Sequence, residues 1–210
     1  MADDALPDTI LGLPAARLRK LAARGRRLAW LGRVQLADPA ARGRLLRQTG
    51  AHIGEGCVML TKDLGTEPYL VTIGDHVWVA TGCLFVTHDT ATWALGEERP
   101  TCGFAPITIG SWCFIGARAI LLPGTRIADN CVGGAGSVVR GAFPARSVIT
   151  GVPGRVTGSI DDYAVKACER ELPLTHGNRS ELRAQLEAHL LSDSAGEEDR
   201  SGTAWTPNRD

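Results

Sequence analysis

The residue best suited to proton transfer in this chain of 210 residues is His88, in the tripeptide Thr87-His88-Asp89. It follows the apolar run LFVT and opens the stretch HDTATWALGEERPTCGFAP. The unperturbed pKa of imidazole lies near neutrality, so a positioned histidine can take the proton of a hydroxyl that attacks an activated carbonyl. Position alone leaves a surface or loop-capping histidine equally open. His88 is therefore a candidate general base.

Two residues that follow His88 could bind a substrate. Asp89 could orient His88 or contact an acceptor, and a loop-capping carboxylate explains it equally well. Trp93 could stack on a sugar ring or anchor the loop. The remaining histidines, at positions 52, 76, 176 and 189, lie outside this stretch. Neither C-x-x-C nor His-x4-His spacing occurs, so we expect no metal site.

A repeat of six residues predicts the element that positions His88. From Ile109, steps of six reach aliphatic residues at every position except Gly133, and the same phase holds upstream. The residues in phase are Ile73, Val79, Phe85, Ile109, Ile115, Leu121, Ile127 and Val139, and Ile53 and Met59 keep the same spacing in a register shifted by the interruption before Ile73. The period fits a short strand and a corner, repeated, so that three hexads make one triangular coil and residues eighteen apart stack. Glycine and asparagine at the corners tolerate a left-handed backbone.

Four of the six cysteines follow the same repeat. Cys57, Cys83, Cys113 and Cys131 each come four residues after an aliphatic residue. Free cysteine packs as a small apolar side chain, so this spacing predicts core positions and no disulfide among them. Cys102 lies in the stretch after His88, and nothing near it in the sequence favours a thiolate. No covalent nucleophile is predicted.

Composition and charge exclude several classes of protein. There are 23 basic and 23 acidic residues, which gives no electrostatic indication of a nucleic-acid partner. No apolar run is long enough to span a bilayer, and the first ten residues do not resemble a secretory signal, so we expect a cytoplasmic protein. Ten basic residues lie between Arg17 and Arg47. Helices packed beside the first coil, with their arginines in solvent, are the favoured interpretation, over a membrane-binding surface.

The chain resembles the hexapeptide-repeat acyltransferases, and most closely their sugar O-acetyltransferase branch. The matching segments, between about Leu45 and Ile160, are EPYLVTIGDHVWVATGCLFVTHD, ITIGSWCFIGARAILLPGTRIADNCVGGAGSVV and GVPGRV. The resemblance implies a mainly β protein, a left-handed parallel β-helix with flanking N- and C-terminal helices. It also implies acetyl-CoA as acyl donor, a homotrimer with sites between neighbouring chains, and His88 as the catalytic base.

The same resemblance assigns further site residues. Ala117 and Ala135 match small residues whose backbone faces the pantetheine arm, and Arg155 matches an arginine near the nucleotide end. Arg140 stands near a common Thr-Lys pair, which is Arg140-Gly141 here, so its contact with phosphate is open. Glu67 lies where related enzymes place an acidic acceptor contact, although a solvated loop acid explains it too.

The predicted organisation has four segments. Residues 1–50 hold helices packed on the β-helix (Leu13–Arg33 and Pro39–Thr49), after a disordered start over residues 1–10. Residues 51–156 form the β-helix, interrupted at Thr61–Leu70 and by an excursion over residues 88–106. Residues 157–192 hold helices at Asp161–Glu171 and Ser180–Leu191, and residues 193–210 form a flexible tail.

Three functions fit these features. The first is acetyl transfer from acetyl-CoA to a hydroxyl of a sugar or polysaccharide. The second is N-acylation of an amino sugar or nucleotide-linked amino sugar on the same fold. The third is a non-catalytic or metal-dependent β-helix, which leaves T-H-D, Trp93 and G-V-P-G-R together unexplained.

Overall fold

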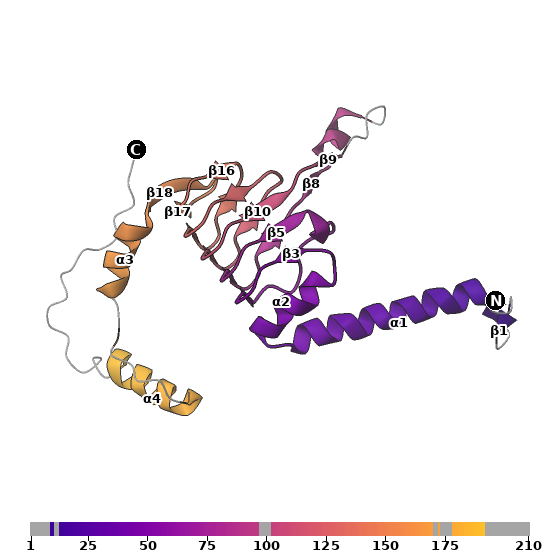
Figure 1. Ribbon diagram of the computed structural model, residues 1–210, viewed down its shortest axis with the longest axis horizontal. Coiled ribbons are helices and arrows are strands. Elements are labelled where there is room, and N and C mark those ends of the chain that lie inside the picture. Colours follow the sequence, from indigo (N-terminus) through magenta and orange to yellow (C-terminus); the bar gives the residue numbers. More distant parts are fainter. Residues whose placement is uncertain (1–8, 11–12, 97–101, 170–171, 173–177, 192–210) are drawn as a thin grey trace. The chain divides into compact units, whose positions relative to one another are not determined.

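The computed structural model describes residues 9–10, 13–96, 102–169, 172 and 178–191 (Figure 1). The chain divides into two compact units, Met1–Ala164 and Val165–Asp210. The first unit is mainly β and carries helices at its N-terminal end, which confirms the predicted class. The expected tail over residues 193–210 lies outside the described residues.

Three sheets of short strands make up the first unit, and the chain visits them in turn. Sheet I contains β3 (His52–Ile53), β5 (Val71–Ile73), β10 (Ile107–Ile109), β13 (Arg126–Ile127) and β16 (Ala142–Phe143). Sheet II contains β4 (Val58–Met59), β6 (Trp78–Val79), β11 (Phe114–Ile115), β14 (Val132–Gly133), β17 (Ser147–Thr150) and β18 (Arg155–Ser159). Sheet III contains β7 (Leu84–Phe85), β12 (Ile120–Leu121) and β15 (Val138–Val139). All neighbours pair in parallel except β17 and β18. We call this stack the prism.

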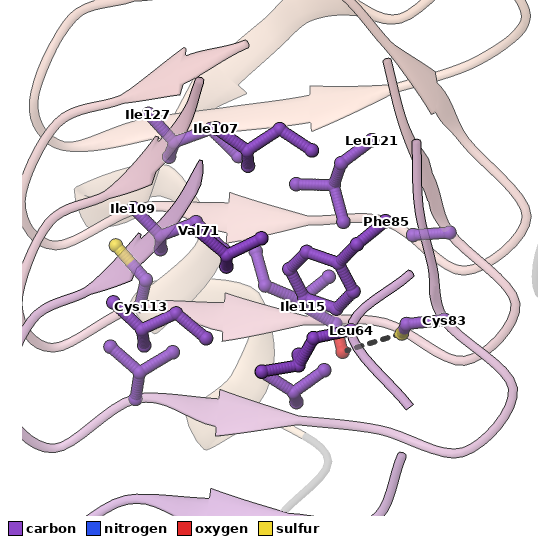
Figure 2. Close-up of a cluster of buried hydrophobic side chains, with 14 of the residues drawn as sticks. Leu64, Val71, Cys83, Phe85, Ile107, Ile109, Cys113, Ile115, Leu121 and Ile127 are labelled. Atoms are coloured by element: carbon purple, nitrogen blue, oxygen red, sulfur yellow. Dashed lines mark hydrogen bonds between the residues drawn. The ribbon is translucent and has the colours of Figure 1, made fainter. Parts of the chain in front are cut away.

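The register of the strands confirms the eighteen-residue stacking. Ile109 pairs with Ile127, and Leu121 pairs with Val139, each eighteen residues further along the chain. The residues in phase with the hexad point inward and are buried, as the side chains in Figure 2 show. Burial of this single apolar column is the main favourable term for the fold.

Corner geometry explains where glycine is required. A Cβ on Gly110 would lie 2.3 Å from Asp129 Oδ1, and one on Gly54 would lie 2.3 Å from Asp75 Oδ1. Those carboxylates accept hydrogen bonds from the backbone of the preceding coil: Ser111 N donates to Asp129 Oδ1 at 2.7 Å. The side chain of one coil thus caps the corner of the one before it, and only glycine leaves room.

The four cysteines in phase with the repeat are buried, as predicted. Each thiol donates to a backbone carbonyl of the next coil, for example Cys113 Sγ to Ala128 O at 3.2 Å. Burial raises the pKa of Cys83, and it raises the pKa of Cys113 to about 11. All six cysteines are free thiols, and these two are poorly suited to act as nucleophiles.

Two interruptions leave the hexad phase, as expected. In the first, the buried Leu64 fills the inward place that a third strand would hold. In the second, β8 (His88–Asp89) pairs antiparallel with β9 (Gly103–Phe104), and the short helix η2 (Ala91–Leu95) lies between them. This hairpin is separate from the three sheets and extends away from the prism (Figure 1).

The N-terminal helices differ in part from the prediction. Helix α1 spans Ala15–Leu36, after a two-residue pairing of β1 (Thr9–Ile10) with β2 (Leu13–Pro14). The expected disorder is therefore wrong for residues 9 and 10. Helix α2 (Pro39–Arg47) is capped by Asp38 and packs on β3 and β4. Of the described part of α1, Trp30 and Val34 pack inward, whereas Leu28 and Leu36 are exposed.

Arg42 joins these helices to the prism. The sequence favoured solvent-exposed arginines, but Arg42 is only 6% exposed. Its Nε donates to Val34 O at 2.9 Å, and its two terminal nitrogens donate to Met59 O, Leu60 O and Ala37 O at 2.6, 3.3 and 2.7 Å. One guanidinium therefore satisfies carbonyls of α1, of the following turn and of the first coil.

Replacing Arg42 by leucine should lower the free energy of unfolding by about 3 kcal/mol, because buried carbonyls lose their donor. Arg44→Leu is the matched control, since Arg44 lies on the same helix and is exposed. Urea unfolding of both variants measures the difference. Equal stability of the two variants would show that the contacts of Arg42 contribute nothing.

The remaining helices are α3 (Ile160–Cys168) and α4 (Arg179–Leu190). Both lie within a few residues of the predicted helices. Asn178 and Glu181 form a reciprocal capping box at the start of α4. Among the described residues, no helix is long and apolar enough to cross a bilayer.

Candidate functional site

His88 lies where the prism ends and the excursion begins. It is the first residue of β8, directly after the buried Thr87. Its side chain is 33% exposed, so the ring is accessible from solvent, while its backbone pairs with Phe104 of β9. A rigid scaffold therefore presents an accessible imidazole, as a general base requires.

The His88 ring contacts the carboxylate of Glu67. Its Oε2 atom lies 2.9 Å from His88 Nδ1, although the two residues are 21 positions apart. Glu67 belongs to the first interruption, immediately before the short helix η1 (Pro68–Leu70). Its side chain is 16% exposed, so the interpretation as a solvated loop acid is wrong.

Hydroxyl groups surround the same carboxylate oxygen. Thr87 Oγ1 donates to Glu67 Oε2 at 2.6 Å, and Thr66 Oγ1 donates to it at 2.8 Å. The hydrogen bond from Thr87, followed by the bond from His88, holds the pKa of Glu67 at about 2, below its ordinary value of 4.5. Glu67 therefore remains ionised throughout the neutral pH range.

The ionised carboxylate of Glu67 determines which nitrogen of the neutral His88 ring carries the proton. A carboxylate only accepts hydrogen bonds, so the Nδ1 atom that faces it must be the one that carries the proton. The lone pair of the neutral ring is then on Nε2. The pair Glu67–His88 is thus arranged to take a proton at Nε2 and to stabilise the resulting imidazolium.

Three neighbours of this pair escaped the sequence interpretation. Thr66 and Thr87 each precede a site residue directly, and that adjacency was the available signal. Phe104 pairs with His88 across the hairpin, and their ring centroids are 5.8 Å apart. The six-residue repeat could not place Phe104 beside His88, because the excursion that contains Phe104 carries no repeat.

The two predicted acceptor contacts in the excursion have different surroundings. Asp89 Oδ1 accepts a hydrogen bond from Ala91 N at 2.8 Å, which is the loop-capping arrangement. Trp93 lies on η2 and is 74% exposed. Trp93 is therefore free to contact a bound molecule, while Asp89 holds the turn that leads to it.

The predicted cofactor residues lie on later coils than His88. Ala117 and Ala135 occupy the corner between sheets II and III on consecutive coils, and both are exposed. Ala117 O accepts a hydrogen bond from Gly136 N at 2.8 Å. Arg140 follows β15, and Arg155 opens β18 with its guanidinium against Gly154 O at 2.9 Å. Both arginines are exposed.

Among the described residues, no group of three or more His, Cys, Asp or Glu is placed to hold a metal ion. The carboxylate and imidazole of the Glu67–His88 pair contact each other directly. A histidine paired with a carboxylate in this way can perform proton transfer.

Comparison with known proteins gives the family. Residues 106–140 match the model described as the hexapeptide repeat of succinyl-transferase. Protein CapG of Staphylococcus aureus is 40% identical over 128 residues, which cover 59% of this chain and 74% of that protein. Galactoside O-acetyltransferase of Escherichia coli is 41% identical over 97 residues, 46% of this chain and 47% of the relative. The chain therefore belongs to the hexapeptide-repeat acetyltransferase family and is an acyltransferase.

Solved structures were also compared with the chain. A galactoside acetyltransferase in complex with coenzyme A is 22% identical and has a TM-score of 0.49, with 80% of this chain and 90% of that chain covered. A maltose O-acetyltransferase from Clostridium difficile is 22% identical and has a TM-score of 0.46, with 66% and 87% covered.

Proposed function

We propose that this protein transfers an acetyl group from acetyl-CoA to a hydroxyl of a sugar or polysaccharide, with His88 as general base. The observation that carries the proposal is the 2.9 Å contact between His88 Nδ1 and the ionised Glu67. It leaves Nε2 as the base, at the edge of a rigid coil and beside an exposed excursion. We also propose that the coils wind in the left-handed sense that the family resemblance implies.

The transfer is direct in this proposal. Nε2 of His88 takes the proton of the acceptor hydroxyl while its oxygen forms a bond to the thioester carbonyl carbon. The tetrahedral intermediate collapses, the carbon–sulfur bond breaks, and the CoA sulfur leaves with the proton that His88 returns. The product is an acetyl ester and free CoA. Glu67 orients the ring and stabilises the imidazolium between the two proton transfers.

The proposed contacts with acetyl-CoA lie on the later coils of the prism. Ala117 and Ala135 have small exposed side chains on one corner, so the extended pantetheine arm could lie close to their backbone along the prism. Arg140 and Arg155 provide guanidinium groups for the phosphates, since arginine binds phosphate oxygens in a planar, bidentate manner. Acetyl-CoA is thus a substrate that lies along the coils with its thioester toward His88.

The acceptor class rests on relatives and on the chemistry of the base. A sugar hydroxyl is a poor nucleophile until its proton is removed, which gives a positioned histidine an evident task. The galactoside O-acetyltransferase relative acts on a hydroxyl by its name. The chain spans only 47% of that relative, so the acceptor needs a direct test.

That test measures the release of free thiol from acetyl-CoA in the presence of sugars and amino sugars. The acetylated product is then treated with mild alkali, which cleaves an ester and leaves an amide intact. An alkali-labile product supports O-acetylation. A faster reaction that yields an alkali-stable product would replace the proposal with N-acylation of an amino sugar.

The outer faces of the prism support a homotrimer. Sheet I presents the polar residues His52, Thr72, Thr108 and Arg126 outward. Sheets II and III present apolar residues instead, among them Trp78, Phe114, Leu84, Ile120 and Val138. Of these, Trp78 is 46% exposed, Phe114 42% and Leu84 55%. Exposed apolar side chains of this size suit contact with neighbouring chains, as in a homotrimer.

We expect light scattering to give the mass of three chains at micromolar concentration. Placing a charge on the apolar face, as in Phe114→Glu, should shift the mass toward that of one chain, because burial of the charge against a neighbour is costly. Thr108→Glu is the control on the polar face. An active monomer would contradict the trimer.

A further inference from the structure

Helix α1 carries positive charge that nothing in the described chain neutralises. Over Ala15–Leu36 it has seven basic residues and no acidic residue, although basic and acidic residues are equal in number in the whole chain. The basic residues are Arg17, Arg19, Lys20, Arg24, Arg26, Arg27 and Arg33. Among the described residues, every ion pair lies outside this helix. The helix therefore presents a strongly cationic surface.

One side of α1 packs against the rest of the first unit. Val34 is 1% exposed, and Trp30, one turn earlier, packs against the buried core. Leu28 lies two positions before Trp30, and Leu36 lies two positions after Val34. Two positions turn an α-helix through about 200°, so both leucines lie on the side that faces away from the core. We call this side the outer face of α1.

The outer face is apolar and uncovered. Leu28 is 69% exposed and Leu36 is 90% exposed. A Cβ built on Gly25 or on Gly32 would meet no described atom within 4 Å. From Ala22 onward the outer face consists of exposed apolar residues only: Ala22, Gly25, Leu28, Ala29, Gly32 and Leu36. Within the described chain, nothing packs on this face along about 20 Å of helix, and such a patch marks an interaction surface.

An open groove carries the outer face onto α2 (Figure 1). Its volume is about 840 Å³. Two exposed arginines, Arg33 and Arg44, belong to its wall. Apolar residues of both helices line the rest, among them Ala29, Gly32, Leu36, Ala41 and Leu45. An apolar channel with guanidinium groups beside it suits a molecule that has a hydrocarbon part and an anionic part.

Basic residues border the outer face on both sides. Arg24 precedes Leu28 by four positions, and Arg26 precedes Ala29 by three, so each lies beside the apolar residues on the helix surface. Both arginines are exposed. Arginine can lay its apolar stem along such a face and extend its charged head to an anion at the border. The cationic groups and the apolar face therefore form one continuous surface.

We propose that the outer face of α1, with the groove that continues it onto α2, binds the surface of a membrane that contains anionic lipids. The helix lies parallel to the membrane plane in this arrangement. Leu28 and Leu36 enter the boundary between headgroups and acyl chains, and the arginines contact the lipid phosphates. The association is peripheral and reversible, and it does not depend on the proposed acetyl transfer.

Other occupants fit these features less well. A second copy of α1 would bring two cationic borders together without a carboxylate on either helix, and like charges across an interface are unfavourable. A nucleic acid would satisfy the arginines through its phosphates and leave the leucines in water. An anionic bilayer accepts both the charge and the apolar side chains, and this distinguishes it from the alternatives.

The first test is sedimentation of the full chain with vesicles. Partition onto phosphatidylcholine vesicles with one third phosphatidylglycerol should be roughly 100-fold stronger than onto phosphatidylcholine alone, and it should weaken in about 0.5 M NaCl. Equal partition onto the two kinds of vesicle would overturn the proposal, as would no binding to either. Tight binding to RNA without vesicle binding would assign the arginines to a nucleic acid instead.

A pair of charge variants tests the arginines. Arg24→Gln with Arg26→Gln should lower partition onto the anionic vesicles roughly 30-fold, because each basic side chain near the surface contributes separately. Arg126→Gln with Arg179→Gln is the matched control, since it removes two exposed positive charges from other parts of the chain. Equal losses in the two pairs would mean that overall charge, and no particular face, attracts the protein.

A second pair tests the apolar face. Leu28→Gln with Leu36→Gln should lower the partition about tenfold or more, since two leucines no longer leave water. Leu190→Gln, at a leucine that is 58% exposed on α4, should bind as the wild type does. Both leucines of the pair are exposed, so the fold and the turnover of free sugar should be unchanged. Undiminished binding by the pair would refute insertion of the outer face, and a fall in mass by light scattering would show that a second copy covers it.

Discussion

The variant His88→Ala should lose about 10²–10⁴-fold in kcat while it remains folded and binds acetyl-CoA. The loss follows because no other group within hydrogen-bond distance of Glu67 can take a proton at neutral pH: its remaining described partners are the hydroxyls of Thr66 and Thr87. Cofactor binding should persist because the proposed contacts, at Ala117, Ala135, Arg140 and Arg155, lie on later coils.

His52→Ala provides the matched control. His52 is also a histidine on the prism, but it is exposed on the outer face of sheet I and has no role in the proposed reaction. Its kcat should equal that of the wild type. Thermal unfolding and a titration with CoA establish that both variants are intact. Full turnover by a folded His88→Ala protein would end the assignment of this residue as the base.

The hexad pattern predicted the prism and its register because each inward residue repeats a single physical requirement, burial in one apolar column. Ile109, Leu121 and their counterparts eighteen residues away lie where the period placed them. The cysteines confirmed the same logic, since their spacing alone indicated that they were core residues. The hexad pattern does not predict the handedness of the coil, because the spacing of inward residues is the same in a left-handed and a right-handed coil.

Features outside the repeat were less accessible. The burial of Arg42 depends on carbonyls of three separate segments, and an arginine-rich helix gives no sign of which guanidinium meets them. Leu28 and Leu36 are apolar residues that were expected to pack inward but are exposed. An apolar stripe on a helix predicts a buried face, but it does not predict which residues of that face another element covers. Trp112 at a corner was also unexpected, since the hexad predicts small residues or asparagine there.

The candidate site shows the same division. His88 was proposed as the base because it follows a strand in phase, opens an excursion and resembles the family's catalytic histidine. The contact with Glu67 was not, because Glu67 lies in an interruption whose length sets no register. Glu67, which was predicted to contact the acceptor, contacts the imidazole of His88. Whether its second oxygen also meets the acceptor depends on the bound substrate, and all three described hydrogen bonds fall on Oε2.

The role of Glu67 gives the second large effect. Glu67→Gln keeps the size of the side chain and removes its charge. The amide can turn its NH2 group toward His88 Nδ1, which favours the tautomer with the proton on Nε2 and leaves no lone pair for the acceptor hydroxyl. We expect kcat to fall roughly 10²-fold or more, since loss of the orienting carboxylate in a hydrolase triad costs about 10⁴-fold. Glu55→Gln, at an exposed carboxylate of the prism, should leave kcat unchanged.

The variant Glu67→Gln also tests the low pKa of the Glu67 carboxyl group. The pKa of Glu67 is about 2 in the folded protein and 4.5 as its ordinary value, so folding favours the ionised form. Its contribution to stability is therefore complete above pH 4.5 and is lost as the pH falls toward 2. The stability difference between the wild type and Glu67→Gln, from urea unfolding, should shrink across that window. A difference that stays constant from pH 6 to the acid limit would mean that the carboxylate is not held ionised by Thr87 and His88, and the orientation of the base would then need another cause.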